Sequence, residues 1–385
     1  MASKVLVVGS GAIGLRTALE LLRNKIPVVL RSAHHPLDKK TCSMGAGGLY
    51  MPYKCEDPRI DKWSSDTLDE LLHLANDEKK KSLVEIVPTL YLMSKHGGMT
   101  TEDFKDFESK DYVGGTNIKT KFPKWTTDPR LSFQHLTIEM LEWQNHALKL
   151  KIPSAEILKK AGYNFGWLFN APIVDAPNML KDLLEEVYEY PVDINVDMGQ
   201  GYANTDEMVA DAKDHGCDAL INCTGLGSME LCNDKDLIGG RGILLHYKRD
   251  CKRNFSDANM ERDTAILTED GPWGTSTDPV YIIPRGDVFV VGGTYYEGNT
   301  NDSLTDDERK RLIENAHLMG IDPSEAYVDE WAGFRPVRKT VRMEIDEETS
   351  ASNGVKVIHS YGHGGSGWTT YVGAAKASLE LLHSD

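Results

Sequence analysis

Short apolar runs flank a helical stripe at the start of the chain. Residues 5–8 (Val-Leu-Val-Val) are continuously apolar, as is typical of a parallel strand buried on both faces. Apolar residues then recur at helical spacing from Leu15 to Leu22, and a second apolar run follows at residues 28–30. This order predicts a β-α-β unit in the first 30 residues.

The same patterns predict further elements along the chain. Helical spacing of apolar residues indicates helices over residues 63–85, 171–188 and 368–382. Residues 192–196 resemble a strand. The apolar run that begins at residue 218 ends in a small-residue turn, and it predicts another strand of the same parallel sheet.

The pattern changes to β between residues 241 and 300. Strand-like runs occupy residues 242–247, 281–284 and 288–293, and the turn at 284–287 joins the last two as a hairpin. These runs predict an antiparallel sheet that forms a second domain inserted between pieces of the first. The predicted fold class is therefore α/β, with a Rossmann-like nucleotide-binding domain and a second, mainly antiparallel β domain.

Composition narrows the classes of partner. The 385 residues carry a net charge of −16, which argues against nucleic acid as the main partner because phosphate backbones repel such a field. Six cysteines without a C-x-x-C pair are expected to be reduced packing thiols in an intracellular protein. We expect no secretory signal and no membrane span. The ending His383-Ser384-Asp385 is not an S-K-L address.

A glycine motif lies between the first predicted strand and helix. Gly9, Gly11 and Gly14 form G-x-G-x-x-G, and the strand–glycine–helix context predicts a dinucleotide site. No G-K-[ST] ending supports a Walker loop, and no H-R-D or D-F-G supports a kinase. The acidic residue expected after the second strand is replaced by Arg31. Its side chain is either a surface charge or a contact to a phosphate near the adenosine.

Two other segments combine glycines or arginines in patterns that suit ligands. Residues 361–367 (Tyr-Gly-His-Gly-Gly-Ser-Gly) precede the last predicted helix, whose N-terminus suits an anion or an electron-rich ring edge. Arg335 and Arg338 lie in a compact predicted turn, and a guanidinium can bind a carboxylate through two parallel hydrogen bonds. No metal motif is present, since His34 and His35 are adjacent rather than four residues apart.

Five blocks of sequence together resemble the D-amino-acid oxidases, an FAD-dependent family that includes D-aspartate oxidase. The blocks are residues 7–15, 222–225, 281–284, 333–338 and 361–365. They occur in the family's order across nearly the whole chain, although residues 85–160 match weakly. The family's fold implies a discontinuous FAD domain (1–55, 165–240 and 335–385) and a substrate domain (56–164 and 241–334).

The resemblance also assigns roles to residues. It implies that Arg335 binds the substrate carboxylate and that the Tyr281 hydroxyl assists Arg335 in this contact. It also implies that the carbonyl of Gly365 accepts a hydrogen bond from the substrate amino group. Met51, Tyr53 and Thr277 would shape the substrate site, and Met51 and Tyr53 favour neutral D-amino acids. The residues implied to contact FAD are Gly9, Ser10, Gly11, Ala12, Ile13, Gly14, Arg31, Ser32, Ser43, Gly48, Leu49, Val196, Cys223, Thr224, Gly225, Gly364, Gly365, Ser366, Gly367, Trp368 and Thr369.

The implied reaction is oxidative deamination. A D-amino acid would transfer a hydride from Cα to the flavin, and O2 would then reoxidise the flavin, releasing hydrogen peroxide, ammonia and a 2-oxo acid. Alternatives are a related flavin oxidase acting on glycine, sarcosine or acidic D-amino acids, a nicotinamide-dependent dehydrogenase, and a flavin-binding protein without turnover. A cytoplasmic or peroxisomal location and a homodimer are compatible with the resemblance.

Overall fold

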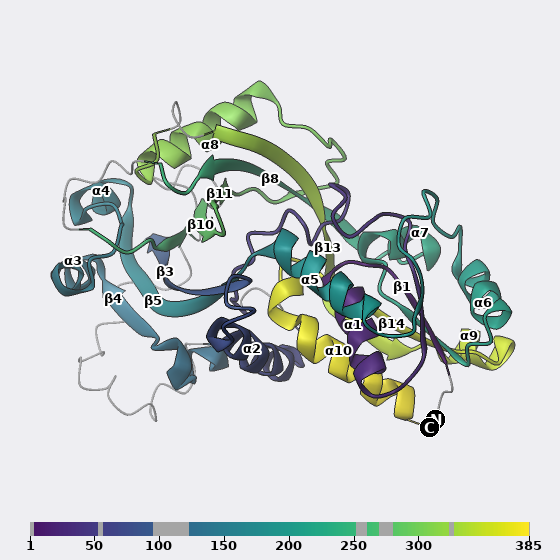
Figure 1. Cartoon of the computed structure of the whole chain (residues 1–385). Helices are drawn as coiled ribbons and strands as arrows, with labels where there is room; N and C mark the ends of the chain where they lie inside the picture. Colours follow the sequence, from purple (N-terminus) through teal and green to yellow (C-terminus); the bar gives the residue numbers. More distant parts are fainter. Residues whose placement is uncertain are drawn as a thin grey trace.

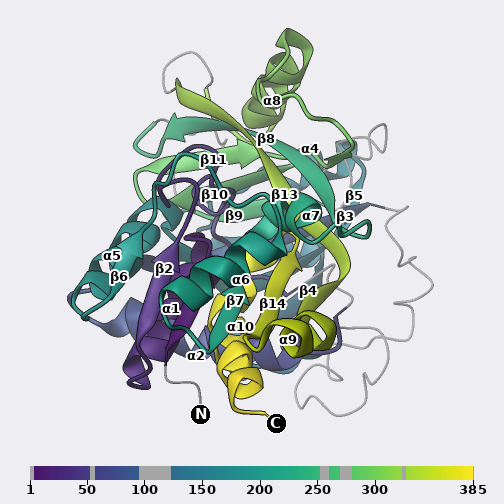
Figure 2. The same ribbon diagram turned by 90° about the vertical axis from the view of Figure 1, so that its right-hand side faces the viewer.

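The computed structural model describes residues 4–52, 57–94, 123–251, 260–268, 280–322 and 327–384. The predicted site residues Tyr53 and Thr277 lie outside these ranges. Within the described part of the chain, no helix has the length and apolar character needed to cross a membrane. Both chain ends lie at the same end of the molecule (Figure 2).

A parallel sheet forms one half of the molecule, in the order β14-β7-β1-β2-β6. Its central strand β1 is buried at every residue, because its continuous apolar run is covered on both faces. α1, α5 and α10 cover one face and α6 covers the other (Figures 1 and 2). These elements span β1 (Val5–Val8), α1 (Ala12–Arg23), β2 (Val28–Arg31), α5 (Ala176–Tyr188), β6 (Asp193–Asn195), α6 (Thr205–Asp214), β7 (Ala219–Asn222), β14 (Lys356–His363) and α10 (Gly367–His383).

A mainly antiparallel region forms the other half, in the order β4-β5-β3-β9-β10-β11-β8, with β3 and β9 parallel and β12 paired to β8. Its apolar core lies between this sheet and the helices α3, α4 and α8. The elements span β3 (Val84–Ser94), β4 (Gln134–Thr137), α3 (Ile138–Leu148), α4 (Ala155–Lys160), β5 (Tyr163–Val174), β8 (Ile238–Lys248), β9 (Ala265–Thr268), β10 (Tyr281–Arg285), β11 (Val288–Gly292), β12 (Tyr296–Glu297) and α8 (Asp306–Leu318).

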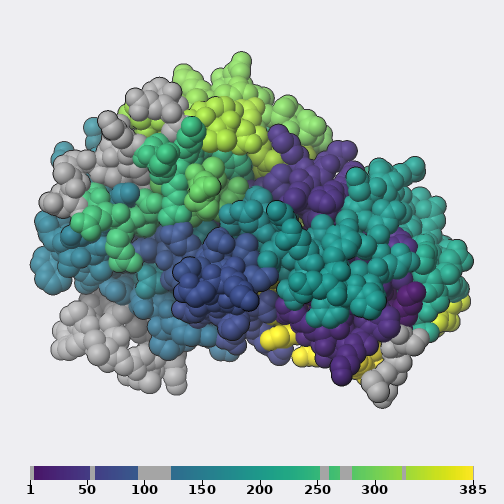
Figure 3. Space-filling model, viewed as in Figure 1, coloured from purple at the N-terminus to yellow at the C-terminus, as the bar shows by residue number. Residues whose placement is uncertain are grey.

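One long strand, β13 (Tyr327–Ile345), joins the two halves into a continuous sheet. It pairs with β8 as far as Val337, and with β14 at Val337 and again from Arg342 to Ile345 after a register shift. Figure 1 shows it running from α8 toward the parallel strands. The space-filling view shows purple N-terminal atoms against both halves (Figure 3). The remaining elements are α2 (Ile60–Asn76), the short helices η3 (Lys124–Thr127), η4 (Pro129–Leu131) and η5 (Gly225–Gly227), α7 (Ser228–Leu231) and α9 (Glu347–Asn353).

The predicted α/β class, the parallel sheet and the hairpin at 284–287 are confirmed. Three local predictions are wrong. The helix predicted over 63–85 ends at Asn76, and β3 begins at Val84. The helix predicted over 171–188 starts at Ala176, because residues 171–174 pair with β3 and Pro177 occupies the first helical turn.

The third wrong prediction is the turn that contains Arg335 and Arg338. Both residues lie in β13, where pairing with β8 is unbroken from Asp329 to Val337. Glycines on β8 leave room for this strand's side chains, since a Cβ added at Gly242 would lie 2.6 Å from the Arg335 guanidinium. The domain boundaries stay a prediction, because one sheet runs through both predicted domains.

Candidate active site

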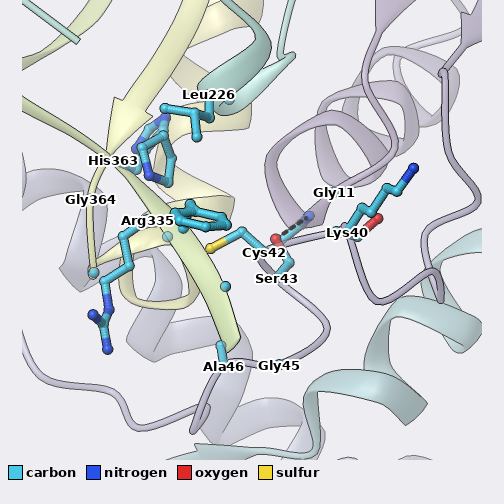
Figure 4. A pocket seen from close by; sticks show the side chains of 18 of the residues that line it. Gly11, Lys40, Cys42, Ser43, Gly45, Ala46, Leu226, Arg335, His363 and Gly364 are labelled. Carbon is cyan, nitrogen blue, oxygen red and sulfur yellow. Dashed lines mark hydrogen bonds between the residues drawn. The ribbon is translucent and has the colours of Figure 1, made fainter. Parts of the chain in front are cut away.

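A cavity of about 1370 Å³ lies where the two halves meet. The parallel half contributes residues 8–13 after β1, residues 223–227 after β7 and most of residues 360–368. These segments lie at the carboxyl ends of parallel strands, where open α/β sheets bind ligands. The antiparallel half contributes Tyr281, Ile283 and Arg335. Figure 4 shows Gly11, Ser43, Arg335 and His363 around this space.

The turn after β1 has the geometry of a phosphate site. Gly9 has a φ of 110°, which favours glycine, and a Cβ added at Gly14 would lie 1.9 Å from the Gly9 carbonyl oxygen. The Ala12 amide donates to the Ser43 hydroxyl over 3.1 Å. The N-cap residue of α1 is Gly11, which has no side chain to cover the end of the helix. The N-terminus of α1 can therefore face an anion in the cavity.

Residues 41–48 form a loop that is fixed from several sides. The Trp368 indole donates to the Ser43 carbonyl within the loop over 3.0 Å, and the Trp331 indole donates to the carbonyl of Lys39, just before the loop, over 3.1 Å. A Cβ added at Gly47 would lie 2.7 Å from Ile283, so β10 supports the loop from below. A larger residue at Gly47 would collide with Ile283, so glycine allows the loop backbone to pack closely on β10. The loop backbone then runs along the cavity wall.

The C-terminal glycine segment leads directly into α10. Gly362 and Gly364 have φ angles of 87° and 56°, and Ser366 caps the helix without a side-chain bond. His363 lines the cavity and is 5% exposed. One ring nitrogen, Nδ1, lies 3.2 Å from the Thr370 hydroxyl, whereas Nε2 has no hydrogen-bond partner among the described residues. Burial lowers the pKa of His363 to about 4.

Buried histidines make the folded state sensitive to mild acid. Burial lowers the pKa values of His135, His359 and His363 to about 4, so the folded chain binds fewer protons than the unfolded chain below about pH 6.5. Stability is expected to fall from pH 6.5 toward pH 4, by about 2 kcal/mol for each of these histidines at pH 5. Urea unfolding at pH 7 and pH 5 measures this loss. The H363N variant should lose less stability between pH 7 and pH 5, by the contribution of one histidine. An unchanged loss in H363N would contradict the lowered pKa of His363.

Two arginines of β13 have different surroundings. Arg338 is bound to carboxylates, with Nε 3.2 Å from Asp234 Oδ2 and Nη2 3.5 Å from Asp236 Oδ2. Arg335 donates from Nη1 to the Thr294 carbonyl over 2.9 Å, and no carboxylate of the described chain lies within 4 Å of its guanidinium. A guanidinium without an acid partner at a cavity wall is suited to a carboxylate ligand.

Tyr281 lies beside Arg335 at the same end of the cavity. Its ring packs on backbone where glycines leave room, since a Cβ added at Gly293 would lie 2.2 Å from the ring. Burial raises the pKa of the Tyr281 phenol, and the neighbouring Arg335 guanidinium opposes this shift. The hydroxyl therefore stays protonated and can donate a hydrogen bond to a bound anion.

Most of the predicted site residues line the cavity. Cys223 is among them, and burial raises the pKa of its thiol to about 12, so it is an unreactive wall residue. Five predicted contacts do not line the cavity: Gly14, Arg31, Val196, Ser366 and Thr369. Arg31 instead pairs with Asp193 over 3.0 Å. Thr369 accepts a hydrogen bond from the Met51 amide over 3.2 Å, which holds Met51 at the cavity.

Sequence reasoning missed Cys42 as a residue of the site. Its thiol lies close enough to Arg335 and Tyr281 to interact with both electrostatically, although it was expected to be a packing residue. Burial raises the pKa of the Cys42 thiol, and the Arg335 charge opposes this shift. The sequence feature that could have identified Cys42 as a site residue is its position in the segment 41–48, which is rich in small residues. Within the described ranges, no group of three His, Cys, Asp or Glu residues is arranged to hold a metal ion.

Comparison with known proteins relates the chain to flavoenzymes. The sequence model of a family described as FAD dependent oxidoreductase matches residues 4–381. A D-amino acid oxidase of Dugesia ryukyuensis is 27% identical over 387 residues, covering 98% of this chain and 97% of the relative. D-aspartate oxidase 1 of Caenorhabditis elegans is 25% identical over 400 residues, covering 100% and 98%.

Solved structures share the fold at lower sequence identity. The glycine oxidase of Geobacillus kaustophilus superposes with a TM-score of 0.70 at 14% identity, covering 99% of this chain and 94% of that protein. At this identity the likeness concerns the fold alone, and it agrees with the α/β architecture and joined antiparallel sheet described above.

Proposed function

The chain belongs to the FAD-dependent oxidoreductase family, and from this premise we propose that it catalyses the oxidative deamination of D-amino acids. Relatives named D-amino-acid oxidase and D-aspartate oxidase align over nearly the whole chain. The observation that carries the proposal is the Arg335 guanidinium, which has no acid partner in the described chain and lies beside Tyr281 in the same cavity as the glycine turns.

FAD is the cofactor of this family, and the residues present fit it. The turn at Gly9 and Gly11 and the N-terminus of α1 would hold the pyrophosphate, with Ser43 beside it. Loop 41–48, Thr224 and the start of α10 would hold the flavin, with the unpartnered Nε2 of His363 at the cavity wall. When bound, FAD accepts the hydride that leaves the substrate Cα.

The protein's part in the reaction is to orient the substrate. Arg335 and the Tyr281 hydroxyl would bind the α-carboxylate, and the Gly365 carbonyl would accept a hydrogen bond from the amino group. Fixing both groups presents Cα–H in one orientation, which supplies much of the rate enhancement. No side-chain base is needed if the amine loses its proton on binding. The two electrons lost by the amino acid reduce O2 to hydrogen peroxide, and water hydrolyses the imino acid to a 2-oxo acid and ammonia.

The walls near Arg335 support a preference for neutral side chains. Leu244, Leu267, Val280 and Ile283 line the cavity on the antiparallel half, where Arg335 is the lone cationic lining residue among those the structure describes. A second carboxylate would therefore lack a cationic partner on this half of the cavity, since the other lining cations, Lys39 and Lys40, belong to the N-terminal segment. The alternatives are acidic D-amino acids, as the names of some relatives suggest, and glycine or sarcosine. The homodimer and the cytoplasmic or peroxisomal location stay predictions.

Anaerobic reduction of the purified flavoprotein distinguishes these substrates. D-Alanine or D-methionine is expected to bleach the flavin absorbance, whereas the L-enantiomers leave it unchanged, because Arg335 and Gly365 hold two substituents and only one enantiomer then presents Cα–H to the ring. D-Aspartate and sarcosine test the two alternatives. Bound flavin that none of these compounds reduces would contradict the proposal.

A further inference from the structure

A second, smaller cavity lies behind the loop that lines the cofactor site. It has a volume of about 230 Å³, and Lys39, Gly45, His246, Arg285, Asp329 and Trp331 are among its walls. We call it the Arg285 pocket. Lys39, Gly45 and Trp331 also line the large cavity, so the start of the cofactor loop separates the two spaces.

Arg285 is a buried cation without an acid partner. It is 6% exposed, and its guanidinium donates from Nη1 to the Ala46 carbonyl and lies 3.5 Å from His246 Nε2. No carboxylate of the described chain lies within 4 Å of it. Other buried arginines are paired: Arg16 with Glu20 and Glu70, and Arg241 with Glu308. Buried charges are ordinarily paired because desolvation is costly.

The pocket's one acid is already bound to another group. His246 Nδ1 lies 2.5 Å from Asp329 Oδ1, which leaves Nε2 facing Arg285. Burial and the Arg285 charge lower the pKa of His246, so the ring is neutral near pH 7. Lys39 adds a second cation at the rim, with no ion-pair partner among the described residues. Asp175 also acts on Arg285 through space, but it does not line the pocket and forms no ion pair with Arg285 among the described residues. The lining itself therefore carries two cations against one carboxylate, which favours an anion.

We propose that the Arg285 pocket binds a small oxyanion, of the size of inorganic phosphate or a short carboxylate, between Arg285 and Lys39. A water molecule occupies about 30 Å³ in the liquid. The pocket is several times larger, so a small oxyanion fits together with some of its hydration water. Because Arg285 also holds the Ala46 carbonyl, the bound anion stabilises the loop at 41–48 from the side opposite the cofactor. This site is independent of the proposed substrate site at Arg335.

Titration of the flavin-bound protein with inorganic phosphate tests the site. Calorimetry at constant ionic strength, with chloride as the exchanged anion, is expected to show one saturable site, and thermal unfolding should shift upward with phosphate. R285M should weaken phosphate binding by about tenfold or more, since a charge-assisted hydrogen bond is lost. K39Q should weaken it less. K79Q, the same charge change at an exposed residue elsewhere, should leave it unchanged.

Two further arms make the outcome decisive. Acetate titrated into the R335L variant tests carboxylate binding without interference from the substrate site. Adding R285M to R335L should weaken acetate binding, as R285M alone weakens phosphate binding. Phosphate binding that is absent, or equally strong in R285M and the unchanged protein, overturns the proposal. If R285M does not fold, K39Q decides, because equal phosphate affinity in K39Q and K79Q would also overturn it.

Discussion

Replacing Arg335 with leucine is expected to raise the KM for a D-amino acid by about a hundredfold or more, because a charge-assisted hydrogen bond contributes about 1.5–3 kcal/mol and two such contacts to the carboxylate are lost. The flavin should remain bound, since Figure 4 shows Arg335 and Gly11, which lies in the turn after β1, on opposite sides of the cavity. Steady-state kinetics with D-alanine, together with the visible flavin spectrum, measure both quantities.

Arg338 provides the matched control for this variant. It lies three residues along the same strand, but its guanidinium is bound to Asp234 and Asp236. Asp234 also accepts a hydrogen bond from Tyr361 over 2.8 Å, and its side chain is 5% exposed. R338L should therefore lower the free energy of unfolding, because a buried carboxylate loses its cation, with a much smaller change in KM. Similar KM changes in both variants would contradict the assignment of Arg335.

Replacing Gly14 with alanine is expected to yield protein without flavin, or no folded protein. The added Cβ would lie 1.9 Å from the Gly9 carbonyl oxygen and 3.3 Å from the Cys223 Cβ. Backbone cannot move aside as a flexible side chain can, so the cost should reach or exceed the upper end of the about 1–3 kcal/mol typical of overpacking. The flavin-to-protein absorbance ratio and the unfolding midpoint measure the effect.

Gly239 provides the control for this glycine. It lies in β8, and an added Cβ would meet its neighbours no closer than 3.5 Å, which is ordinary van der Waals contact. G239A should therefore keep its flavin and nearly its full stability. If G14A bound flavin as tightly as G239A, the close packing of α1 on the turn after β1 would not be required for the cofactor site.

Local sequence patterns predicted the elements that depend on local physics. The apolar run of β1, the glycine turn behind it and the stripe of α1 needed no other part of the chain to be recognised. The hairpin between β10 and β11 was likewise indicated by its turn. The start of α5 was predicted wrongly, because it depends on residues 171–174 pairing with β3, a contact between distant segments.

The candidate site shows the same division. Motifs and the family resemblance identified Gly9, Tyr281, Arg335 and the glycines near residue 364 as candidates. They could not distinguish Arg335 from Arg338 by environment, because the carboxylates that pair with Arg338 come from residues about a hundred positions earlier. Cys42 was missed for the same reason, since its neighbours Tyr281 and Arg335 approach it only in the folded chain.

Periodicity and glycine spacing are local properties of the chain, so they were enough to predict a dinucleotide-type β-α-β unit, an antiparallel region and a set of candidate site residues. Which charges are neutralised and which face a cavity became known from the folded chain alone. Arg31 and Arg338 are paired, whereas Arg335 and Arg285 have no acid partner among the described residues. Ion pairing depends on distances between remote segments. Asp193 reaches Arg31 because β6 pairs with β2, and Arg335 reaches the cavity because β13 joins the two halves of the sheet.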